Sequence, residues 1–317
     1  MNYYIGVDLG GTKIAAGITD ESGKILIKDS VPTLAEREAD EIVKDMAKLC
    51  LSLAERMNLT MKDIRYVGVA TPGIANQNRG TVDYSCNLPM VNYPLVQRLQ
   101  NFLGIKKVLI ENDANAAALG ETICGAAQNC NNSVMITLGT GVGGGCIINR
   151  KVYSGFNFCG PELGHIVIEH DGVPCSCGRK GCWESYSSAT ALIRMTKEKL
   201  LLTKDTIMWE MTGNDINKVS GKTAFTASKQ GDKAGQEVVD KYIGYLASGI
   251  VSVINIFQPE VLSIGGGVSG EGDYLLKPLM KIVDKEEYAR DSTARTKIKI
   301  AQLGNDAGII GAAMLGI

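Results

Sequence analysis

The stretch from Gly160 to Glu184 constrains the fold more than any other part of the sequence. It reads GPELGHIVIEHDGVPCSCGRKGCWE and holds four possible soft-metal ligands within eighteen residues: His165, Cys175, Cys177 and Cys182. Thiolates and imidazole at this density suit tetrahedral Zn²⁺. Gly178 and Gly181 lie between the last two cysteines, where a tight loop needs residues that tolerate positive φ. The spacing predicts a structural zinc site, and the alternative is a set of buried thiols that pack as small apolar side chains.

These residues resemble the signature of the ROK family, which groups bacterial sugar kinases and sugar-responsive repressors. The resemblance rests on GPELGH, nine further residues, and then CSCGRKGCWE. In that family the histidine and the three cysteines hold zinc. By motif position the resemblance implies that Glu162, His165 and Glu184 contact the hydroxyl groups of the sugar. It also implies an α/β protein with the actin-like ATPase fold, in which two RNase H-like domains surround a cleft.

The composition limits the classes of function. The chain has 317 residues, of which 45% are apolar, so it can form two domains with a substantial core. Its 33 basic and 34 acidic residues give a net charge of −1, so no net field attracts nucleic acid or an acidic membrane. The N-terminus does not resemble a signal peptide, and no apolar run approaches the ~20 residues of a membrane span. We therefore expect a cytoplasmic protein.

Strand and helix patterns alternate along the chain. Strands are expected at 3–8, 14–19, 25–29, 64–70, 107–111, 260–264 and 297–302, and helices at about 42–57, 114–127, 234–257 and from 306. An irregular loop is expected between residues 73 and 107. Residues 133–150 repeat the opening pattern of strand, glycine-rich turn with a threonine, and strand, which indicates duplicated halves.

The domain boundary is expected at a hinge near Ala116–Gly120, because no stretch reads as a disordered linker. A small N-terminal domain then covers residues 1–117 and a large domain covers 118–302. The C-terminal helix, 303–317, is expected to pack on the small domain.

The first of three glycine-rich turns follows the first strand. Its candidate residues for binding a nucleotide are Asp8, Gly10, Gly11, Thr12 and Lys13. Glycines let a phosphate approach backbone N–H groups, and a carboxylate beside them can hold Mg²⁺, often through water. The turn lacks the spacing of a Walker A loop, and alone it is equally an ordinary hairpin turn.

Two further glycine-rich turns follow. Thr140 and Gly141 lie in LGTGVGGG, and the third turn holds Gly265, Gly266 and Gly267. Each alone could be a flexible hairpin or loop, although glycine is costly to order. Together, and in this order, the three turns resemble the two phosphate loops and the adenosine loop of sugar kinases with the actin-like fold. The resemblance therefore implies ATP binding.

The run from Glu111 to Asn115 closes a strand and opens a helix. Asp113 could be a helix N-cap or, at the end of a strand that faces the inter-domain cleft, a general base. ROK kinases show this E-N-D-A-N motif, which implies that Asp113 is the base and Asn112 a sugar ligand. Gly73 and Asn87 match sugar-loop positions less specifically, and Asn87 is equally a turn residue.

These parts predict transfer of the γ-phosphoryl group of MgATP to the 6-hydroxyl of a hexose, with Asp113 accepting the proton. Four protein ligands leave a zinc ion no open position, so its expected role is to fix the loop that contacts the sugar. Glucose is the expected sugar, because ENDANAAALGE most resembles the glucose kinases of the family. Kinases for N-acetylmannosamine, N-acetylglucosamine, fructose, mannose or allose would use nearly the same residues.

Three other classes of protein fit less well. Repressors of the family need a helix-turn-helix ahead of the ATPase core, but only seven residues precede Asp8. A zinc-ribbon interaction module leaves Asp113 and the glycine turns unexplained. An actin-like or chaperone-like ATPase leaves Glu162, His165 and Glu184 unexplained. Since the family favours dimers, the resemblance implies a homodimer or higher homo-oligomer whose partners are ATP and a hexose.

Overall fold

The computed structural model describes residues 1–317, which divide into two compact units. Unit 1 comprises Met1–Met135, Gly145–Pro161 and Ala301–Ile317, and unit 2 comprises Ile136–Gly144 and Glu162–Ile300. The predicted functional domains, 1–117 and 118–302, stay a prediction.

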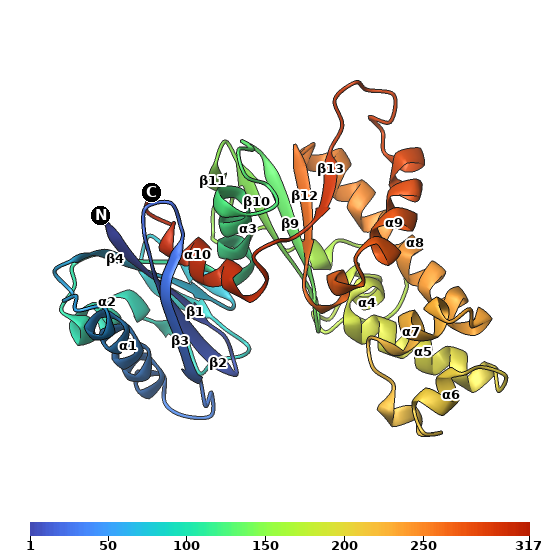
Figure 1. The fold of residues 1–317 in the computed structure, drawn as a ribbon, viewed down its shortest axis with the longest axis horizontal. Coiled ribbons are helices and arrows are strands. Elements are labelled where there is room, and N and C mark those ends of the chain that lie inside the picture. Colours follow the sequence, from blue (N-terminus) through green and yellow to red (C-terminus); the bar gives the residue numbers. More distant parts are fainter. The chain divides into compact units, whose positions relative to one another are not determined.

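A five-stranded sheet forms the centre of unit 1 (Figure 1). Its strands, in spatial order, are β3 (Ile25–Pro32), β2 (Lys13–Thr19), β1 (Tyr3–Leu9), β4 (Ile64–Thr71) and β8 (Val108–Asn112). The first three form an antiparallel meander, and β4 and β8 continue the sheet parallel to β1. Both faces of this sheet are covered, which is why its central strands read as nearly continuous apolar runs.

Helices α1 (Ala39–Arg56) and α2 (Leu95–Leu103) contribute to one core of unit 1, together with the odd-numbered residues of β1. On the other face lies α10 (Ala307–Ala313), which packs against α3 (Asp113–Cys124). Successive side chains of a strand alternate between faces, so Asp8 points to the α10 side.

The approach between α10 and the sheet is close enough to require glycine. A Cβ atom at Gly6 would lie 1.9 Å from the carbonyl oxygen of Ile309, and one at Gly68 would lie 1.8 Å from that of Ala312. The Tyr66 hydroxyl donates to the Ala313 carbonyl at 2.6 Å and fixes the end of the helix. The small residues of the C-terminal helix therefore serve this contact.

The irregular loop predicted between residues 73 and 107 is wrong in part. It contains α2 and a three-stranded sheet formed by β5 (Ile74–Asn76), β6 (Thr81–Tyr84) and β7 (Val91–Tyr93). Strands of three or four residues are too short to show a period of two, and α2 spans fewer than three turns.

The predicted internal repeat corresponds to a second five-stranded sheet. Its order is β11 (Lys151–Val152), β10 (Val142–Ile148), β9 (Ser133–Leu138), β12 (Val261–Gly265) and β13 (Lys297–Ile300). As in the first sheet, a hairpin with a glycine turn lies beside a strand that comes much later in sequence. The division between the units runs through β9 and β10.

Helices make up most of the rest of unit 2. They are α4 (Glu184–Ser187), α5 (Ala189–Leu202), α6 (Met208–Met211), α7 (Thr223–Lys229), α8 (Lys233–Phe257) and α9 (Asp273–Glu286). The N-cap of the long helix α8 is Asp232, whose carboxylate accepts from the Gly235 N–H at 2.7 Å. Its C-cap is Gln258, directly before Pro259. The predicted helix at 234–257 is therefore confirmed.

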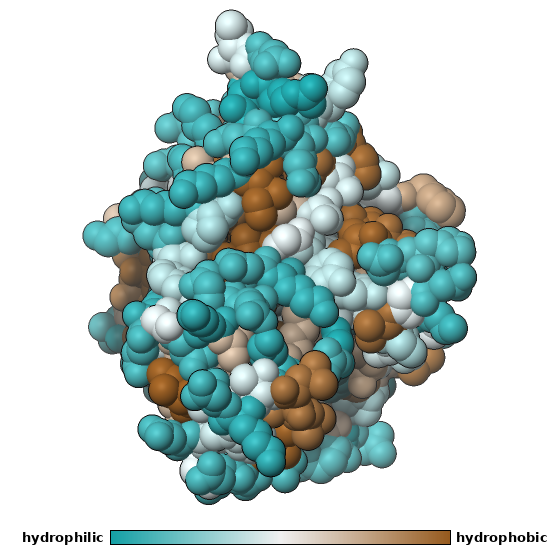
Figure 2. Space-filling view, turned by 90° about the vertical axis from the view of Figure 1, so that its right-hand side faces the viewer, coloured by the Kyte–Doolittle hydropathy of each residue, from teal (hydrophilic) through white to brown (hydrophobic).

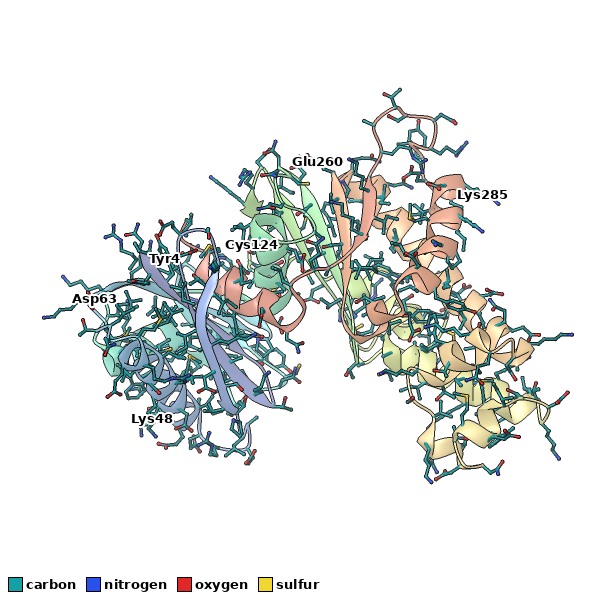
Figure 3. The ribbon with its side chains drawn as sticks, viewed as in Figure 1. Tyr4, Lys48, Asp63, Cys124, Glu260 and Lys285 are labelled. Atoms are coloured by element: carbon teal, nitrogen blue, oxygen red, sulfur yellow. The ribbon has the colours of Figure 1, made fainter.

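Charged side chains lie at the periphery of each unit, as Lys48 and Asp63 of unit 1 and Lys285 of unit 2 illustrate (Figure 3). The face drawn in Figure 2 is mainly hydrophilic, with separate apolar spots between charged and polar residues. No helix combines the length and the apolarity that a membrane crossing requires. The cytoplasmic location stays a prediction.

Candidate functional site

Asp113 is the first residue of α3 and directly follows the end of β8. The N-cap of this helix is Asn112, whose Oδ1 accepts from the N–H groups of Ala114 at 2.9 Å and Asn115 at 3.2 Å. The alternative that Asp113 is the N-cap is therefore wrong. Its own carboxylate accepts from the adjacent Ala114 N–H, at 2.8 Å, and the Asn112 side chain also interacts with it.

The pKa values of Asp8 and Asp113 are both raised. Burial raises the pKa of Asp113, although the hydrogen bond from the Ala114 N–H acts in the opposite direction. Burial and then the negative charge of Asp113 raise the pKa of Asp8 to about 6, while Lys13 lowers it. Part of the burial comes from α10, since a Cβ at Gly308 would lie 2.7 Å from Cγ of Asp8. Such a pair favours a proton or a cation between its members.

The first glycine turn lies beside a predicted sugar-loop residue. A Cβ atom at Gly11 would lie 3.2 Å from Cβ of Asn87, so these two positions are in contact range. The hydroxyl of Thr33 donates to the Gly10 carbonyl at 2.6 Å and supports the turn from β3's end. Thr12 and Lys13 remain exposed, with their side chains accessible to a ligand.

Gly73 lies beside Asn112. The Asn112 Nδ2 donates to the Gly73 carbonyl at 3.2 Å, while its Oδ1 caps α3. Gly73 has a φ of +90°, and a Cβ there would lie 2.1 Å from the carbonyl oxygen of Tyr84, so only glycine fits. Unit 1 thus brings together the candidates Gly73, Asn112 and Asp113, and separately Gly11 and Asn87.

Glu111 is a residue of this region to which the sequence assigned no role. Its side chain is buried and accepts from the Asn112 N–H at 2.8 Å and the Asn115 amide at 3.1 Å. It also accepts from the Ser154 hydroxyl at 3.0 Å and from the Gln77 amide. Burial raises the pKa of Glu111, against these four hydrogen bonds. Three separate segments of unit 1 therefore meet at one carboxylate beside Asp113.

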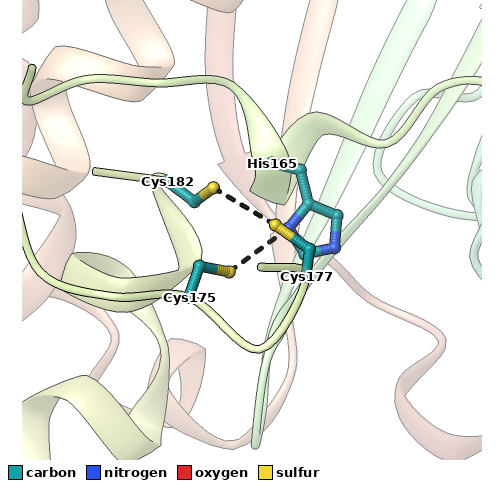
Figure 4. A group of neighbouring side chains, drawn as sticks. All are labelled: His165, Cys175, Cys177 and Cys182. Carbon is teal, nitrogen blue, oxygen red and sulfur yellow. Dashed lines mark hydrogen bonds between the residues drawn. The ribbon is translucent and has the colours of Figure 1, made fainter. Parts of the chain in front are cut away.

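The four predicted metal ligands of unit 2 lie together (Figure 4). The ligand atoms of His165, Cys175, Cys177 and Cys182 are all within 4.8 Å of one another. Cys175 Sγ is 3.6 Å from His165 Nδ1, and Cys177 Sγ is 3.6 Å from Cys182 Sγ. Two thiolates at 2.3 Å from a tetrahedral zinc ion would be about 3.8 Å apart, so this arrangement fits the metal.

Glycine shapes the loop around the cluster. Gly178 and Gly181 have φ values of +88° and +77°, as their spacing predicted. A Cβ atom at Gly181 would lie 1.7 Å from the carbonyl oxygen of Glu169. Trp183, which directly follows the last cysteine, is fully buried against α8, where a Cβ at Gly249 would lie 2.0 Å from its ring.

The cysteines differ in acidity without a cation. Burial raises the pKa of Cys175, but hydrogen bonds from Cys177, Cys182 and Ser185 outweigh it and lower the value to about 6. Burial and the neighbouring thiols raise the pKa of Cys182 to about 12. One thiolate forms readily and makes further ionisation unfavourable, so a bound cation would be needed to hold several thiolates.

In unit 2, Glu184 lies next to the second of the three glycine turns. Its Oε2 accepts from the Val142 N–H at 2.9 Å, and a Cβ at Gly141 would lie 2.3 Å from that oxygen. The third turn lies beside the second, because a Cβ at Gly266 would lie 2.5 Å from the Leu138 carbonyl oxygen. Glu162 is exposed and directly precedes the 3₁₀ turn Leu163–His165.

Comparison with known proteins identifies the relatives of this chain. The model of the ROK family matches residues 4–317. The glucokinase of Thermotoga maritima is 38% identical over 98% of this chain and 96% of its own length, and that of Streptomyces coelicolor is 36% identical over 99% and 98%. The structure of a ROK family glucokinase from Streptomyces griseus with glucose and AMPPNP is 35% identical, covers 99% of both chains and superposes with a TM-score of 0.81.

These likenesses extend over the whole chain rather than over a motif alone. They confirm the predicted α/β fold of the actin-like ATPase type. With a family model that spans nearly every residue, the chain belongs to the ROK family.

Proposed function

We propose that this chain is an ATP-dependent hexose kinase whose sugar is glucose. The observation that carries the proposal is its similarity to glucokinases at 36–38% identity over at least 96% of either chain. Asp113, half-buried at the start of α3 and with the helix capped by Asn112, supports a kinase rather than a sugar-binding regulator.

In the proposed reaction Asp113 is the general base. It accepts the proton of the 6-hydroxyl as that oxygen bonds to the γ-phosphorus of ATP, and the bond from the γ-phosphorus to the bridging oxygen of ADP breaks. The raised pKa of Asp113 brings it closer to neutral pH, where proton transfer is most effective. Phosphoryl transfer needs little covalent work, so the rest of the site positions the reactants.

We assign the sugar hydroxyls to Gly73, Asn87, Asn112, Glu162, His165 and Glu184. Asn112 uses its Oδ1 for the cap, while its amide group donates to Gly73 and interacts with Asp113, so it lies directly beside the proposed base. His165 would turn one ring nitrogen to the cysteine cluster and keep the other for a hydroxyl group.

The nucleotide is assigned to the three glycine turns. Backbone N–H groups near Thr12 and near Thr140 and Gly141 would contact the phosphates, and the turn at 265–267 would lie against the adenosine. Asp8 fits a magnesium site, because burial and the negative charge of Asp113 raise its pKa, and a bound cation would offset both effects. A bound Mg²⁺ would neutralise charge on the β- and γ-phosphates, with Lys13 adding a second positive charge.

We assign a structural zinc ion to His165, Cys175, Cys177 and Cys182, since their ligand atoms fit its tetrahedral geometry. The four residues would fill every coordination position and fix the segment that carries Glu162 and Glu184. Elemental analysis of protein purified without added metal tests this assignment, and less than half an equivalent of zinc per chain would count against it.

The substrate is tested by measuring phosphoryl transfer from ATP across a panel of hexoses. We expect glucose 6-phosphate by phosphorus NMR, with lower kcat/KM for mannose, fructose, allose, N-acetylmannosamine and N-acetylglucosamine. Faster turnover of an N-acetylhexosamine would keep the kinase but change its sugar. A chain that binds glucose and phosphorylates none of these sugars would instead be a regulator.

The family favours dimers, so we also propose a homodimer or a higher homo-oligomer. Light scattering behind gel filtration tests this, and a mass of one chain at all concentrations would contradict it.

A further inference from the structure

The second glycine turn, residues 139–144, is held by the segment that follows the cysteine cluster. The Glu184 carboxylate accepts from the Val142 N–H at 2.9 Å. The Ala189 N–H donates to the Gly139 carbonyl at 2.8 Å, and the Thr190 hydroxyl donates to the Thr140 carbonyl at 2.8 Å. Three successive peptide groups of the turn are thus hydrogen-bonded to residues at the start of α4 or α5.

The segment that precedes the cluster also packs on this turn. A Cβ atom at Gly164 would lie 2.1 Å from the Val142 carbonyl oxygen, and one at Gly144 would lie 2.6 Å from the Leu163 side chain. Leu163 and Gly164 directly precede His165, the first ligand of the cluster. The turn therefore touches both ends of the segment that the four ligands hold together.

Glu184 links the second glycine turn to the cysteine cluster. While Oε2 holds the turn, Oε1 lies 4.0 Å from Sγ of Cys175. Cys182, another ligand, is two residues before Glu184, and Trp183 between them is fully buried. A loss of order at the cluster would reach the turn through this carboxylate.

We propose that Glu184 and Thr190 hold the second glycine turn in the shape that receives the phosphates, so that the cysteine cluster supports nucleotide binding as well as sugar binding. The inference rests on the proposed nucleotide role of that turn. Glycine-rich backbone loses more conformational freedom than any other on ordering, so contacts that order it beforehand increase affinity. Glu184 is thereby a positioning residue for ATP in addition to its assignment to the sugar.

The test measures the Kd of Mg-AMPPNP by calorimetry without sugar, and the Kd of glucose without nucleotide. Thr190→Val removes one hydrogen bond to the turn, and we expect AMPPNP to bind about three- to tenfold more weakly with glucose affinity unchanged. Glu184→Ala should weaken both ligands, AMPPNP by about tenfold or more, because it removes a charged acceptor.

Two further variants separate support of the turn from general damage. Glu184→Gln keeps an acceptor for the Val142 N–H, so AMPPNP affinity should stay within about threefold while glucose affinity falls. Thr196→Val is the matched control, since Thr196 lies on the same helix and donates to the Leu192 carbonyl at 2.7 Å without touching the turn. It should bind AMPPNP like the wild type.

Cys177→Ser tests the cluster itself. Zinc content should fall together with AMPPNP affinity, although Cys177 belongs to no glycine turn. The inference is overturned if Glu184→Ala and Thr190→Val both bind AMPPNP within twofold of the wild type while circular dichroism shows them folded. A wild type that binds no AMPPNP at all would instead overturn the proposed function.

Discussion

The two five-stranded sheets share one strand order, yet their glycine turns are built from different chemistry. The first turn, between β1 and β2, carries Asp8 before the glycines and Lys13 after them. In the second turn, between β9 and β10, the corresponding positions are Thr137 and Val142. The first turn therefore brings its own charges, whereas the second is neutral and takes its carboxylate from Glu184, far along the chain.

The difference assigns separate tasks to the two regions. The edge of the first sheet holds acidic groups whose pKa values burial raises, among them Asp8 and Asp113. The second turn is instead held in shape by a segment with a metal-binding cluster. If the comparison is correct, changes in the first region lower kcat, and changes in the second raise KM or Kd.

Asp113→Asn tests the first half of the comparison and has the largest expected effect. The change keeps the shape of the side chain but removes the proton acceptor, so kcat should fall by about 10²–10⁴-fold, or about 3–5 kcal/mol of barrier. Binding of ATP and glucose should change far less. Steady-state kinetics and the melting temperature are measured on the same protein, and a kcat within about fivefold of the wild type would refute the base.

Cys177→Ser tests the second half of the comparison, the role of the metal-binding cluster. We expect zinc to be lost and the glucose KM to rise by about ten- to a hundredfold, with a smaller change in kcat, because the ligands act by orienting a loop. Elemental analysis and kinetics check this. Cys50→Ala is the control, since Cys50 is buried in the core of unit 1 outside the cluster and its loss should leave zinc in place. A zinc-free variant with normal glucose KM would remove the distinction between the two regions.

Glu111→Gln is a further test of the first half of the comparison. Glutamine replaces one acceptor oxygen with a donor, so at least one of the four groups bonded to Glu111 loses its partner, at a cost of about 1–3 kcal/mol. We expect kcat to fall by about ten- to a hundredfold, because Glu111 holds the backbone N–H of Asn112, the residue directly before Asp113.

The matched control for Glu111, which lies on β8, is Glu121→Gln on the following helix, α3. Glu121 is also buried, but it accepts from the backbone N–H groups of Ala126, Gln302 and Leu303. Its change should lower the melting temperature and leave kcat near the wild-type value. Equal effects of the two changes on kcat would mean that Glu111 is merely structural.

Asp8→Asn compares the two turns directly, and its effect is measured as the pH dependence of stability in the ligand-free protein rather than as turnover. The pKa of Asp8 rises from 3.8 to about 6 on folding, so the folded protein binds the proton more tightly. Stability should therefore fall as pH rises from about 4 to about 6, by at most about 3 kcal/mol. The asparagine variant should lose this slope and be more stable near pH 7 without ligands.

Urea unfolding of the ligand-free protein between pH 4 and 7.5 checks the slope. Thr137→Val, at the corresponding position of the second sheet, should leave the slope as it is in the wild type. An Asp8→Asn variant with an unchanged slope would show that Asp8 does not titrate in this range.

The local parts of the site could be predicted from the sequence, and the distant contacts could not. The cluster ligands lie within eighteen residues, and each glycine turn is one continuous stretch, so spacing alone located them. Two groups that donate to Glu111, the Gln77 amide and the Ser154 hydroxyl, lie on distant segments that only the fold brings together. The contact of Glu184 with Val142 spans 42 residues and has no pattern in the sequence.

The N-cap of α3 shows a second limit of prediction from the sequence. Asn and Asp are equally good N-caps, so the sequence Asn112-Asp113 does not say which of them starts the helix. The backbone decides it: Asn112 is extended, with φ of −61° and ψ of 146°, and its oxygen reaches the amides beyond it. The short strands β5 to β7 were missed for a similar reason, because three residues cannot display a period.

The close packing of α10 on the glycines of β1 and β4 has a consequence for biosynthesis. A ribosome makes the five strands of the first sheet before residue 113, but it makes Ala307–Ala313 only after all of unit 2. Until then the face that holds Gly6 and Gly68 has no cover from this helix. The first unit of the nascent chain therefore stays incomplete until the second unit has been synthesised.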